Sequence, residues 1–64
     1  MLLYSVRCVI VSMSGAREPV RFDVLIAERY AERVYDKVRN YVQDKVCCKG
    51  EHAENIKLTW VGVV

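Results

Sequence analysis

Side-chain amides are scarce in this chain: Asn40, Gln43 and Asn55 are the only ones among its 64 residues. Few amides together with many charged residues are typical of proteins from very hot environments, so we expect a thermophilic source. Long apolar runs are also lacking. Arg7 interrupts the apolar N-terminal stretch, and no run approaches the roughly 20 residues that a membrane span requires. No basic leader or cleavage site is recognisable. We therefore expect a cytoplasmic protein with no membrane partner.

The residue groupings that carry catalysis are absent as well. The chain has no glycine-rich phosphate loop and no pair of carboxylates set in apolar sequence. His52 is the only histidine, and the sequence shows no evident serine or acid partner for it in a nucleophilic site. We predict that the protein is not an enzyme, that it has no small-molecule substrate and that it needs no cofactor.

The three cysteines do not form a recognisable framework. Cys47 and Cys48 are adjacent, His52 follows four residues after Cys48, and no second ligand pair is present, whereas structural zinc sites need four ligands. Cys8 falls in the middle of a predicted strand and is not expected to reach the other two thiols. Adjacent cysteines also close a disulfide only with strain. The sequence thus predicts no metal site.

Patterning predicts one small domain over residues 1–64. Apolar residues alternate over residues 2–13, a turn composition follows at 14–19, and alternation resumes over 20–26. The period changes to that of a helix over 28–47, and alternation returns over 56–64. The order is strand, strand, helix, strand. Because crossover connections are right-handed, the last strand is expected beside the first.

The predicted fold class is therefore α+β: a three-stranded, mostly antiparallel sheet of strand order 2-1-3 with one helix on one face. The face beneath the helix is expected to carry Tyr4, Val6, Cys8, Phe22, Val24, Ile26, Leu58 and Trp60. The open face is expected to carry an apolar patch of Val9, Val11, Leu25, Val61 and Val63. A chain this short buries only roughly 60% of its unfolded surface, so its core alone gives little stability. A protein neighbour that covers the apolar patch would add to this stability.

Cationic residues are predicted to gather at one end of this fold, although the net charge is only +2. The 45–55 loop and the hairpin turn are expected at the same pole, which would carry Arg17, Arg21, Lys45, Lys49 and His52. On the helix, Arg29, Arg33 and Lys37 recur every four residues. Like charges at this spacing repel, and a bound polyanion would relieve the repulsion. We predict RNA binding by both groups; a merely solvated charged face is the alternative for the helix row.

The layout resembles the archaeal large-subunit ribosomal protein LX family, which is related to the eukaryotic L18a proteins. The similarity is carried by the step at Ala27 into the helix, by Glu32-Arg33-Val34-Tyr35, and by the closing Ile56-Lys57-Leu58 segment. The basic loop motif of the family has no clear counterpart in residues 44–55. The resemblance implies an archaeal, ribosomal RNA-binding structural component of the large subunit, with ribosomal RNA and neighbouring ribosomal proteins as partners.

A second class of function remains open from the sequence. A protein-binding regulator, such as a small viral inhibitor, or a homodimer would use the apolar patch on the open face and would need no RNA.

Overall fold

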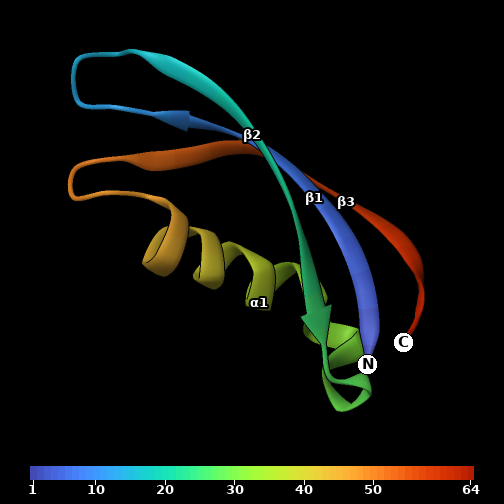
Figure 1. The fold of residues 1–64 in the computed structure, drawn as a ribbon. Coiled ribbons are helices and arrows are strands. Elements are labelled where there is room, and N and C mark those ends of the chain that lie inside the picture. Colours follow the sequence, from blue (N-terminus) through green and yellow to red (C-terminus); the bar gives the residue numbers. More distant parts are fainter.

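Three long strands and one helical segment make up the computed structural model, which describes all of residues 1–64. Strands β1 (Leu2–Val11) and β2 (Arg17–Ile26) form a hairpin, and β3 (His52–Val63) follows the helical segment. The central strand, β1, pairs antiparallel with both neighbours, which gives the strand order β2-β1-β3 (Figure 1). The predicted α+β fold and strand order are confirmed.

The hairpin turn lies earlier in the chain than the composition predicts. The Ser12 amide donates to the Ala16 carbonyl at 2.9 Å, and the Ala16 amide donates to Ser12 Oγ at 3.2 Å. Gly15 adopts a φ of 87° in this turn, a conformation that favours glycine. Strand β2 therefore begins at Arg17 instead of Val20, and Pro19 lies within it. Proline is tolerated there because β2 is an edge strand.

Strand β3 starts at His52, before the predicted start at Ile56, so the loop that precedes it is shorter than expected. Two irregularities in the pairing let the 12 residues of β3 lie beside the 10 residues of β1. The register shifts between Arg7 and Val9, and again between Leu3 and Tyr4. Asn55 lies in the first shift with a φ of 56°. Asparagine is one of the few residues besides glycine that enter this left-handed region readily.

The helical segment is not the single α-helix predicted over 28–47. It consists of a 3₁₀ segment η1 (Glu28–Arg33), the α-helix α1 (Val34–Tyr41) and a π-helical segment η2 (Val42–Val46). No side chain caps the start at Ala27, and the backbone departs from helical geometry at Arg33, with φ −124° and ψ 24°. Short 3₁₀ segments are frequent at the ends of α-helices.

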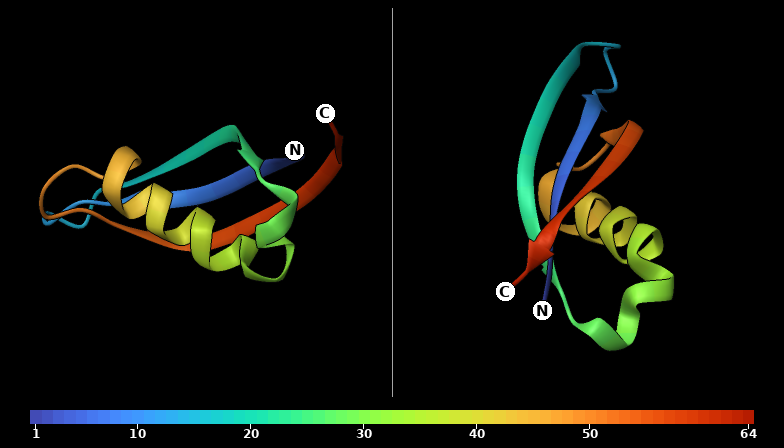
Figure 2. Two further views of the ribbon diagram at one scale, coloured as in Figure 1. Left: turned by 90° about the horizontal axis from the view of Figure 1, so that it is seen from below. Right: turned by 90° about the vertical axis from the view of Figure 1, so that its right-hand side faces the viewer.

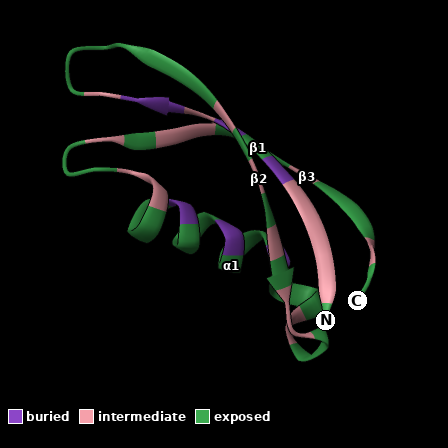
Figure 3. Ribbon diagram, in the orientation of Figure 1, coloured by how far each residue is buried: buried purple, intermediate pink, exposed green.

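The core lies between α1 and one face of the sheet. Strand β1 contributes Val6, Cys8 and Ile10, and the helical segment contributes valines one turn apart: Val34, Val38 and Val42. Only 7 of the 64 residues are buried, so the core is thin for a chain of this length (Figure 3). The helical segment covers one face of the sheet and leaves the other open (Figure 2). None of the helical segments has the length and apolar character needed to cross a membrane.

Candidate nucleic-acid interface

Three cationic side chains form one row across the sheet. Arg7 lies opposite Arg21 of β2 and opposite Lys57 of β3. Residues paired in this way project from the same face. Because residue 7 alternates with the buried Val6 and Cys8, the row lies on the open face, away from the helix. With neighbouring strands about 4.8 Å apart, the row spans roughly 10 Å.

These three cations have no partner of opposite charge. Each side chain is exposed, and none of the ion pairs in the chain involves them. Like charges directly opposite each other destabilise a sheet. Two carboxylates are nearest in register: Asp23 lies opposite Ser5 and forms no ion pair, and Glu54 lies opposite Val9 and is paired with Arg17 and His52. The row therefore carries a repulsion that an external anion would relieve.

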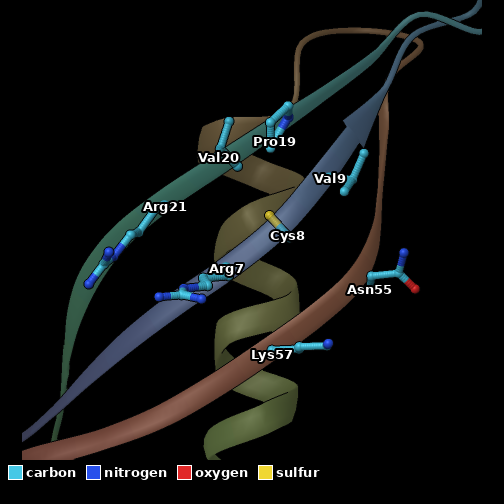
Figure 4. Close-up of a pocket in the computed structure, with 8 residues that line it drawn as sticks. All are labelled: Arg7, Cys8, Val9, Pro19, Val20, Arg21, Asn55 and Lys57. Carbon is cyan, nitrogen blue, oxygen red and sulfur yellow. The ribbon is translucent and has the colours of Figure 1, made fainter.

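A hollow of about 640 Å³ lies over this row. Arg7, Arg21 and Lys57 line it together with Val9, Pro19 and the side chain of Asn55. Figure 4 shows these side chains on the sheet, with the helix on the far side. The register shift at Asn55 lies beside the hollow, and such irregularities often re-aim side chains next to functional sites.

The two bends do meet at one pole, as predicted. A Cβ built on Gly50 would lie only 2.5 Å from Met13 Sδ, which places the 47–51 bend against the hairpin turn (Figure 1). Yet two of the predicted RNA-binding residues are already paired there. Glu54 forms an ion pair with Arg17 at 2.9 Å and accepts a hydrogen bond from His52 Nε2 at 2.9 Å. His52 thus has an acidic partner that the sequence did not reveal. Hydrogen bonds from His52 and from Arg17 lower the pKa of Glu54.

The pole as a whole carries no excess of positive charge. Its cations are Arg17, Lys45 and Lys49, beside the neutral or singly charged His52. Residues 12–18 and 44–54 also contain four carboxylates: Glu18, Asp44, Glu51 and Glu54. One of them, Glu51, accepts a hydrogen bond from the Cys48 amide at 2.6 Å and so fixes the loop. RNA binding by this loop stays a prediction. Because the pole carries no excess of positive charge, the open face of the sheet is the better candidate interface.

The basic row predicted on the helix loses its regular spacing. Arg29 and Arg33 belong to the 3₁₀ segment, and only Lys37 belongs to α1, so the four-residue repeat does not place the three on one helical face. Two of them converge on an aromatic ring instead. Arg29 Cζ lies 4.9 Å and Lys37 Nζ 4.0 Å from the ring centroid of Tyr30, which stabilises both cations locally.

The apolar patch predicted on the open face is only partly present. Val9 and Leu25 lie on that face, but Val11 is buried. Val63 is opposite Leu2, on the helix-side face, because the register shift leaves Val61 unpaired and reverses the alternation beyond it. Trp60 is opposite Tyr4 on the helix-side face as predicted, but it is 59% exposed.

One of the two helix-end cysteines packs against the hairpin, as the sequence favours, but Cys8 lies nearer to it than expected. Cys47, at the end of η2, packs against the core cluster that contains Cys8, so these two thiols approach each other. Burial raises the pKa of both thiols, and the charge of Cys47 adds to the effect at Cys8. Nowhere in the chain do three or more His, Cys, Asp or Glu side chains group closely enough to hold a metal ion.

Comparison with protein-family models, with curated proteins and with solved structures finds no match to this chain.

The row of Arg7, Arg21 and Lys57 could be predicted only in part from the sequence. Alternation already places these residues on the open face, and a hairpin register would have paired Arg7 with Arg21. The position of Lys57 required the register of β3, which depends on the shift at Asn55.

Proposed function

We propose that this protein is a non-enzymatic RNA-binding domain that holds a phosphate backbone against the open face of its sheet. The observation that carries the proposal is the row of Arg7, Arg21 and Lys57, which are adjacent, exposed and without carboxylate partners. Neutralising phosphates with such side chains releases counterions and supplies most of the affinity of sequence-independent binding.

Recognition on this surface is directed at the backbone and not at the bases. Single-stranded RNA is usually read by aromatic side chains on which bases stack. The open face offers none, because Phe22 is opposite Val6 on the helix-side face and Trp60 is opposite Tyr4. Arginine suits the proposed role, since its planar guanidinium binds phosphate in bidentate fashion.

Ribosomal RNA is the RNA that we propose, on the strength of the resemblance to the LX family. As a structural component of the large ribosomal subunit, the protein would act in the cytoplasm beside other ribosomal proteins. Arg29 and Lys37, held over Tyr30 on the helix side, would then be free to contact a second RNA segment or a neighbouring protein.

A salt titration of RNA binding tests the proposal. Three phosphate contacts to a single strand predict that log K falls with log salt concentration with a slope of about −2. The variant R7Q/R21Q/K57Q should lose nearly all of this slope. Its control is R17Q/K45Q/K49Q, which removes the same number of charges from the pole of the two bends and should keep the slope. Loss of binding in the control alone, or no binding by the unmodified protein at low salt, would overturn the proposal.

One observation favours the second candidate, a protein-binding regulator. Trp60, Val61 and Val63 are large apolar residues exposed together at one end of β3. Exposed apolar patches are typical of protein–protein contact sites. Specific capture of a single host protein, lost in a Trp60→Ala variant and unaffected by R7Q/R21Q/K57Q, would support this candidate.

A further inference from the structure

The two edges of the sheet differ in how they resist pairing with another strand. The outer edge of β2 carries Pro19 and four charged residues, namely Arg17, Glu18, Arg21 and Asp23. Proline and charge are common protections of an exposed edge. Strand β3 forms the other edge, and its residues 58–63, Leu-Thr-Trp-Val-Gly-Val, contain neither a charge nor a proline. Apart from the irregularity at Val61, this edge has none of these protections.

The side chains along this stretch are also open to contact. Trp60, Val61 and Val63 are 59%, 56% and 65% exposed. Beyond β3 no further strand follows in the sheet (Figure 1). The helical segment begins at this end of the sheet, where Glu28 pairs with Met1, and α1 runs from there toward the other end (Figure 2). The backbone groups on the outer side of β3 are therefore accessible together with these apolar side chains.

We propose that residues 58–63 of β3 pair antiparallel with the same residues of a second copy of this chain. The stretch is complementary to itself: where an antiparallel pairing is centred between Trp60 and Val61, Leu58 meets Val63, Thr59 meets Gly62 and Trp60 meets Val61. No like charges are brought opposite each other, although each chain carries a net charge of +2. Cross-strand pairs of aromatic and β-branched residues are among the favourable ones in sheets.

The available area fits a reversible dimer. The three exposed side chains offer roughly 200–300 Å² of apolar surface per copy. With the paired backbone, the contact falls at or below the lower end of specific interfaces, about 1,200 Å² in total, where association is weak. We therefore expect monomers and dimers in exchange, with a dissociation constant of roughly micromolar order or weaker.

Pairing of this kind would form one continuous sheet of six strands. The two-fold axis of the dimer would run perpendicular to this sheet, so the open faces of both copies would lie on the same side. If the proposed RNA-binding function holds, the two cationic rows would then form one longer surface. The dimer itself does not depend on that function.

Sedimentation velocity without nucleic acid, over a concentration series from about 1 μM to 1 mM, tests the dimer. The unmodified chain should shift from monomer to dimer, and Trp60, the only tryptophan, should shift its emission to the blue as it becomes covered. Val61→Lys should remain a monomer at every concentration because it brings like charges together. Val61→Glu should behave likewise, and an equimolar mixture of the two should associate again.

The control is Leu25→Lys on β2, where the side chain is 52% exposed on the other edge strand. This variant should dimerise like the unmodified chain. Circular dichroism shows whether each variant is folded. An unmodified chain that stays monomeric throughout, a failure of the mixture to associate, or a dimer that is lost in Leu25→Lys would overturn the proposal. RNA binding by a strictly monomeric chain would leave the proposed function standing and refute only the dimer.

Discussion

Replacing Val38 by alanine should remove a large part of the stability of this domain. Val38 is completely buried and lies in the middle of α1, between Val34 and Val42 in the core cluster. Two methyl groups are lost, worth about 1.6 kcal/mol in transfer free energy. The cavity left behind raises the expected loss to roughly 2–3 kcal/mol. A 64-residue domain typically has roughly 3–10 kcal/mol of stability, so this is a substantial share.

Thermal unfolding followed by circular dichroism measures this effect. A loss of 2–3 kcal/mol corresponds to a fall in Tm of roughly 10–20 °C for a domain of this size. The matched control is Val64→Ala, the same chemical change at a side chain that is 74% exposed. It should change Tm by no more than about 2 °C. Equal Tm values for the two variants would refute the reasoning, because Val38 would then not be at the centre of the core.

Two further predictions concern pH. Hydrogen bonds from His52 and Arg17 lower the pKa of Glu54, so its small contribution to stability should be present above the ordinary carboxyl value of 4.5 and disappear as the pH falls through the lowered value. Urea unfolding at several pH values should show this acid loss in the unmodified chain and less of it in Glu54→Gln; identical slopes would contradict the role of Glu54. Burial raises the pKa of Cys8 and of Cys47, so the free energy of unfolding should fall as the pH rises above the ordinary thiol value of 9.0. Cys47→Ala should flatten this alkaline decline, and a decline as steep as that of the unmodified chain would exclude the Cys47 thiol as a cause.

The architecture followed from the sequence because its dominant signals are periodic. Alternation over residues 2–11 and 20–26 and the helical period of Val34, Val38 and Val42 each report burial on one face, and burial decides the layers. The meeting of the hairpin turn and the 47–51 bend at one pole could also be predicted, because the strand order fixes which ends of the elements lie together.

The predictions that were wrong concern local features of the structure, which leave no periodic pattern in the sequence. The shifts at Asn55 and Val61 each add residues to β3 without altering its composition, and they changed the face on which Val63 lies. The first helical residues form a 3₁₀ segment, which disperses the row of Arg29, Arg33 and Lys37. The pairing of Arg17 with Glu54 depends on a contact between β2 and β3 residues that only the folded chain brings together.

Mapping bound RNA by NMR tests the central claim most directly. On titration with a single-stranded RNA, the side-chain Nε–Hε signals of Arg7 and Arg21 and the backbone amide of Lys57 should shift together and saturate together. The amides of Lys45 and Lys49 should stay in place, as should the Nε–Hε signal of Arg17, which is held by Glu54. Shifts confined to Lys45, Lys49 and Arg17, with Arg7 and Arg21 unaffected, would contradict an interface on the open face of the sheet.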